Sequence, residues 1–139
     1  ASNGASYYFQ HEVGKNEILR PTSTTTTTNA ISAYIRSGDF DLDVDGDGEY
    51  FIKLRRFIPD FKNLTGTADV TLYLRSYPAD TTTAKGETYI GPFTITTSTD
   101  KVDTRARARL ASIQIESYNI DDNWRYGIFR MDSQPDGRR

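Results

Sequence analysis

Cysteine is absent from the sequence, and histidine, methionine and tryptophan each occur once. Without cysteine the chain can form no disulfide scaffold, zinc–thiolate site or thiol nucleophile. The single histidine, His11, has no second histidine at metalloprotease spacing, and any Ser-His-Asp triad would have to use it on a short strand. We therefore expect that the chain is not an enzyme and has no catalytic, cofactor-binding or metal-ligating residues.

Long apolar runs are also missing. No stretch approaches the roughly 20 residues that a membrane-spanning helix needs, and no signal peptide is visible. The chain begins at Ala1 without a methionine. We interpret this start as that of a processed chain or of a fragment of something longer, and we favour the fragment.

The residues that are plentiful favour strands. Aromatic residues make up 12% of the chain, with nine tyrosines and seven phenylalanines. Threonine is very common, and sustained runs of helix formers are scarce, so the composition predicts β structure. Apolar stretches alternate with short turns and no helix intervenes, which indicates an antiparallel all-β fold. A sandwich-like domain and the closing blades of a β-propeller both fit this pattern.

The expected strands follow one another along the main body. Gly46 and Gly48 form a turn within this series, and residues 135–137 form a turn-like tail. We predict strands over residues 32–44, 49–58, 70–75, 89–96, 104–117 and 124–132.

Three segments are expected from the pattern. Residues 1–20 hold a short N-terminal strand over 7–14, and residues 30–139 form the antiparallel β domain. Between them, residues 21–29 are rich in threonine and bury nothing, so we interpret them as a linker.

Charge is unevenly distributed, although the formal net charge is only -2. Residues 1–50 carry eight acidic and three basic side chains, whereas residues 51–139 carry eleven acidic and fourteen basic ones. Such polarity favours contact between parts of the chain, or between neighbouring copies, over binding of nucleic acid.

An acidic alternation precedes the second expected strand. Asp41, Asp43 and Asp45 match the first ligand positions of an EF-hand calcium loop. The match fails at the twelfth position, where the loop needs a bidentate glutamate and this sequence has Ile52. A strand would bury the intervening apolar residues and expose the acids, giving a solvated or salt-bridged face. A calcium site of another type is the alternative, and we expect that folding needs no metal. The alternating acids are Asp39, Asp41, Asp43, Asp45 and Asp47.

A basic ladder occupies the longest expected strand, where Arg105, Arg107 and Arg109 would share one face. Like charges at this spacing repel one another unless acids face them. The leading hypothesis is pairing with Asp39, Asp41 and Asp43, within the chain or across a subunit contact. A phosphate-binding stripe and a plain exposed face are the alternatives.

The single tryptophan, Trp124, lies beside Arg125 and Tyr126. This group could stack against a sugar or form a cation–π contact. We favour a core tryptophan on the last strand, with Tyr126 on the same face.

An ordered series of short segments resembles a known family. The segments include Tyr34–Asp41, Arg55–Asp60, Thr104–Arg107, Trp124–Gly127 and Pro135–Arg139. Together they resemble the C-terminal part of virion structural proteins of the tail nozzle, tail tubular or tail hub type from short-tailed phages, including cyanophages. The resemblance covers roughly residues 30–139, and the chain is far shorter than members of that family.

The resemblance implies a structural role in the virion tail. It implies a homo-oligomeric ring around the channel through which DNA is ejected, other tail proteins as neighbours, and non-specific contact with the genome. It also implies assembly in the host cytoplasm and transfers no catalytic residue. A receptor- or glycan-binding β module of a virion is the alternative, and an enzymatic depolymerase is a more distant one.

Overall fold

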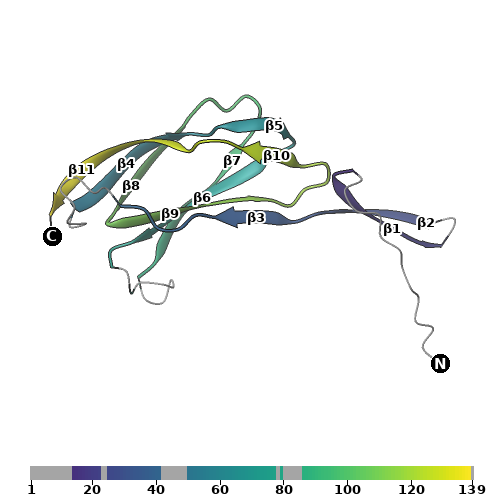
Figure 1. Cartoon of the computed structure of the whole chain (residues 1–139), viewed down its shortest axis with the longest axis horizontal. Helices are drawn as coiled ribbons and strands as arrows, with labels where there is room; N and C mark the ends of the chain where they lie inside the picture. Colours follow the sequence, from purple (N-terminus) through teal and green to yellow (C-terminus); the bar gives the residue numbers. More distant parts are fainter. Residues whose placement is uncertain (1–13, 23–24, 42–49, 78, 80–85, 139) are drawn as a thin grey trace.

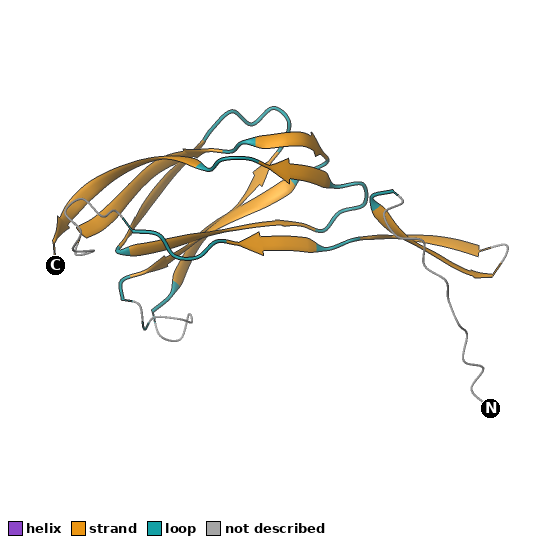
Figure 2. Cartoon of the chain, viewed as in Figure 1, coloured by secondary structure: helices purple, strands orange, loops and turns teal. Residues whose placement is uncertain are grey.

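The computed structural model describes residues 14–22, 25–41, 50–77, 79 and 86–138. Within these ranges every regular element is a strand, and all strand pairs are antiparallel (Figure 2). The predicted antiparallel all-β fold is therefore confirmed, and the body is sandwich-like.

The lower layer of the body in Figure 1 is a four-stranded sheet. β9 and β6 are its central strands, and β3 and β7 are its edges. In spatial order the sheet contains β3 (Ala33–Arg36), β9 (Leu110–Ser117), β6 (Ala68–Arg75) and β7 (Thr88–Ile95).

The upper layer contains a three-stranded sheet and a two-stranded one. The two-stranded sheet extends the layer, because β4 leads into β5 and β10 leads into β11 (Figure 1). The three-stranded sheet has the order β11 (Arg130–Arg138), β4 (Tyr50–Ile58), β8 (Val102–Ala108), and the two-stranded sheet pairs β10 (Asn123–Tyr126) with β5 (Phe61–Thr65).

The core lies between these layers and follows the two-residue period of the strands. On β4 the buried side chains include Ile52, Leu54 and Phe57, while the residues between them point outward. The Phe57 ring meets that of Phe93 on β7 edge to face, with centroids 5.6 Å apart. Aromatic and aliphatic side chains from both layers thus form one contiguous core.

A hairpin projects from the body beyond β3 (Figure 1). It pairs β1 (Asn16–Thr22) with β2 (Thr25–Ala30), and we call this hairpin the arm. Within the segment interpreted as a linker, 21–29, residues 21–22 end β1 and residues 25–29 belong to β2. Threonine is polar, but it is β-branched and therefore suits a solvent-exposed strand.

The long strand predicted over 104–117 is divided in the structure. β8 pairs with β4 in the upper layer and β9 pairs with β6 in the lower one, so the chain changes layer at Arg109. The backbone N–H of Arg109 donates to the carbonyl of Arg75 at this corner. The buried positions also change phase here, from Ala106 and Ala108 to Ala111 and Ile113.

Three other expected boundaries differ. The strand predicted over 32–44 is limited to β3, followed by an isolated bridge between Phe40 and Ala111, and residues 42–49 lie outside the described ranges. The last predicted strand is divided into β10 and β11, and residues 135–137 belong to β11. The N-terminal strand expected over 7–14 lies outside the described residues except for Gly14, which is in a bend.

Candidate functional site

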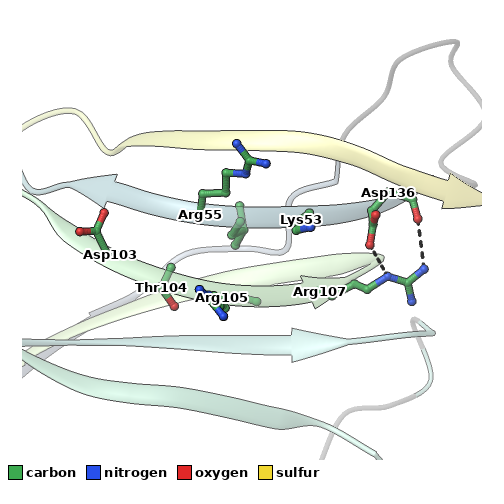
Figure 3. Close-up of a pocket in the computed structure, with 9 residues that line it drawn as sticks. Lys53, Arg55, Asp103, Thr104, Arg105, Arg107 and Asp136 are labelled. Carbon is green, nitrogen blue, oxygen red and sulfur yellow. Dashed lines mark hydrogen bonds and ion pairs between the residues drawn. The ribbon is translucent and has the colours of Figure 1, made fainter.

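A highly charged concavity lies on the outer face of the three-stranded sheet. It is an open groove of about 740 Å³ over β4 and β8, with Asp136 of β11 at one end (Figure 3). We call it the basic groove, and its charged side chains are Lys53, Arg55, Asp103, Arg105, Arg107 and Asp136.

Strand alternation places these cations on the outside. On β4 the side chains of Ile52 and Leu54 are buried, so Lys53 and Arg55 face solvent. On β8 the small side chains of Ala106 and Ala108 face the core, which sends the neighbouring arginines to the outer face. The sequence prediction that Arg105 and Arg107 share one face thus agrees with the strand geometry.

Arg107 is held by a partner that the sequence prediction did not name. Its Nε donates to Oδ2 of Asp136 at 2.5 Å, and its Nη2 donates to the Asp136 carbonyl at 3.1 Å (Figure 3). Its guanidinium also lies 4.0 Å from the centroid of the Phe51 ring. Both side chains of the ion pair are partly exposed, so the pair orients Arg107 more than it stabilises the fold.

Arg109, the third member of the predicted ladder, lies at the corner between β8 and β9 and is only partly exposed. Its guanidinium is 4.8 Å from the Phe51 ring centroid and 5.8 Å from that of Tyr77. The ladder therefore bends at its last member, because the chain changes layer there.

Among the described residues, neither Asp39 nor Asp41 forms an ion pair with the ladder. Asp39 forms an ion pair with Arg75 on the lower layer, so the intrachain pairing predicted for Asp39 is wrong. Asp41 is exposed, and Asp43, Asp45 and Asp47 lie outside the described residues. The expectation about calcium in this segment stays a prediction, and the described ranges contain no group of three potential metal ligands.

Three cations of the basic groove have no acidic partner among the described residues: Lys53, Arg55 and Arg105. The groove's second acid, Asp103, accepts from Arg56 at 3.2 Å. Lys53 stands directly opposite Arg107 in the β4–β8 register. Like charges placed this way repel each other, so the groove attracts an anion.

A second charged cluster fastens the β3 edge to the body and was not predicted from the sequence. Arg36 on β3 pairs with Glu87 at 3.0 Å, and its guanidinium lies 3.8 Å from the centroid of the Tyr73 ring. Arg75 pairs with Asp39 just beyond β3. Arg36 and Asp39 lie far from Arg75 and Glu87 in the sequence, so only the strand order brings the two ion pairs together.

Trp124 is partly buried and packs against the core, in agreement with the favoured interpretation over an exposed sugar-binding group. It packs edge to face on Phe61 with centroids 5.9 Å apart, and its indole N–H donates to Ser117 Oγ at 3.0 Å. Tyr126 lies on the same face and also packs against the core. Neither ring forms an exposed platform for a sugar, and His11 lies outside the described residues.

No protein-family model matches the sequence, and no curated protein matches it either. Within the described residues, no helix is long and apolar enough to cross a membrane.

Proposed function

We propose that the chain is a structural component of a phage tail, of the nozzle or tubular type, and that it builds a ring through contacts between copies. The resemblance described above supports the place in a tail. The observation that carries the assembly argument is the arm, which leaves the body directly beside an open sheet edge (Figure 1).

The arm has little support from the described part of its own chain. β1 and β2 pair only with each other, and the described threonines of β2 are all exposed. Among the described residues, the hydrogen bonds between the arm and the body lie at its base, where Asn16 bonds to Asp121 and Lys15 bonds to Thr65. A two-stranded hairpin is only marginally stable in water, so a surface of another molecule is the natural support for the arm.

The edge beside the arm is also incomplete. Ile35 on β3 stands opposite Ile115 on β9, so both side chains lie on the core-facing side of the sheet. Ile115 is 2% exposed but Ile35 is 53% exposed, so the core-facing side of the sheet is open to solvent at β3. Ile31 and Tyr34 nearby are exposed as well. Soluble proteins normally protect such an edge, so we assign it to contact with the next copy.

The two surfaces differ from each other, which favours a ring. A contact between unlike patches is heterologous, and it closes into a ring when the rotation between copies allows it. The acidic first third of the sequence and the basic remainder give neighbouring copies complementary charge.

Ile35→Asp tests this proposal. A charge at the uncovered edge opposes burial against a neighbouring copy. It should change the stability of the monomer little, because Ile35 is already half exposed there. We expect the full chain to form a defined oligomer by light scattering and the variant to remain monomeric, with an unchanged melting temperature.

The matched control is Ile128→Asp, because Ile128 is also an exposed isoleucine but lies between β10 and β11. This control should assemble normally. Normal assembly of Ile35→Asp, or an equal loss in both variants, would remove the β3 edge from the proposal.

A further inference from the structure

We propose that the outer face of the upper layer, centred on the basic groove, binds the phosphate backbone of double-stranded DNA without reading its sequence. This site is distinct from the arm and the β3 edge. It needs no second copy of the chain, so it does not rest on ring formation.

The unpaired cations extend beyond the groove. Lys62 on β5 and Arg125 on β10 stand directly opposite each other and are both exposed. Their neighbours Phe61, Trp124 and Tyr126 pack against the core, so alternation places both cations on the outer face.

Five cations therefore share one face of the described structure without an ion pair. Two of them form a like-charge pair across β5 and β10, and the other three line the groove beside Arg107. Such repulsion costs stability unless an anion is bound. The five are Lys53, Arg55, Lys62, Arg105 and Arg125.

The chemistry of the groove favours phosphate over a protein partner. The side chains that point into it are charged, because Leu54 and Ala106 turn inward and Thr104, on the same side of β8 as Ala106, buries its hydroxyl. A protein interface has an apolar centre, whereas contacts with a DNA backbone need only cations and hydrogen-bond donors.

The face also suits a duplex better than a single strand. Single-strand binding uses aromatic side chains on which bases stack. The aromatic ring nearest the groove, Phe51, is already occupied by the guanidinium groups of Arg107 and Arg109. A duplex needs no such platform, because its phosphates lie on its outside.

The test uses the full chain and a fluorescent, mixed-sequence DNA duplex, with anisotropy measured over a series of salt concentrations. Each phosphate neutralised contributes about -0.9 to the slope of log K against log salt, so five cations predict roughly -4 to -5. Arg55→Gln/Arg105→Gln removes two groove charges and should make the slope less negative by about 2. Affinity at low salt should fall at least tenfold.

Lys15→Gln/Lys101→Gln removes two exposed cations that lie outside the groove, and it should leave the slope unchanged. Circular dichroism must show the same strand signal for both double variants. The proposal is overturned if the duplex does not bind at low salt, or if the two variants lose affinity equally. Displacement of the duplex by poly-L-glutamate at equal charge concentration also overturns it, since an acidic protein would then serve as well.

Discussion

Individual polar side chains of the body differ in whether their buried polar atoms have hydrogen-bond partners. Asp69 is 5% exposed, and its carboxylate accepts hydrogen bonds from Thr94 at 2.7 Å and from Tyr118 at 2.6 Å. The bond to Asp69 and its negative charge raise the pKa of the Tyr118 hydroxyl. By contrast, the buried hydroxyl of Tyr126 has no hydrogen-bond partner among the described residues. Residues of the same type therefore contribute differently to stability.

The raised pKa of Tyr126 predicts how the stability of the fold changes with pH. Burial, followed by the nearby carboxylate of Asp60, raises its pKa to about 12. The unfolded value is about 10, so the folded chain retains the proton longer. The stability from neutral Tyr126 is fully present below pH about 10 and is lost as the pH rises towards about 12.

Tyr126→Phe should reduce this alkaline loss, and it should be neutral or stabilising at neutral pH because it removes an unsatisfied hydroxyl. Urea unfolding on both sides of pH about 10 measures the effect. Tyr89→Phe, at an exposed position, is the control, and this variant should still lose stability at alkaline pH. Equal behaviour of the two variants would show that Tyr126 is not the responsible group.

At this scale the sequence predicted which side chains face outward better than it predicted their partners. The alternation of apolar residues around Lys53 and Arg55 is visible in the sequence, as is the Arg105–Arg107 spacing. The partner of Arg107 is not visible, because Asp136 reaches it only through the pairing of β11 with β4. That pairing contains a register shift between Asp132 and Ser133, which the local sequence pattern does not predict.

The strands follow the sequence closely where burial is strong. β4, β6 and β7 begin and end within two residues of the ranges predicted from apolar and β-branched runs. β5 was missed, because only Phe61 and Leu64 of its five residues pack on the core. The arm was missed because its second strand buries little, so its composition resembles that of a linker.

Deleting the arm tests whether it is an independent element. Asn16 stands opposite Ala30, so a short glycine linker can replace residues 16–30. The body should keep its β-type circular dichroism and lose at most about 1–2 kcal/mol, because the bonds that the described residues lose at the base are the exposed ones between Asn16 and Asp121. A variant that fails to fold would show that the arm belongs to the core, whereas a folded monomer would agree with a role in assembly.

The whole molecule separates two kinds of surface. The arm and the β3 edge lie together (Figure 1), and Ile18, Ile31, Tyr34 and Ile35 are exposed there, whereas the basic groove of the upper layer is lined by cations. The all-β class followed from composition, but the division into layers depends on the corner at Arg109. Long-range pairing of this kind is set by the packing of the whole core, so the sequence alone left sandwich and propeller open.

The most direct test of the proposed tail ring is the mass and shape of the full chain in solution, from light scattering combined with negative-stain electron microscopy. We predict closed rings with a central opening and a mass that is an integer multiple of 15.7 kDa. A chain that stays monomeric at every accessible concentration, or that forms only open filaments, would contradict the account.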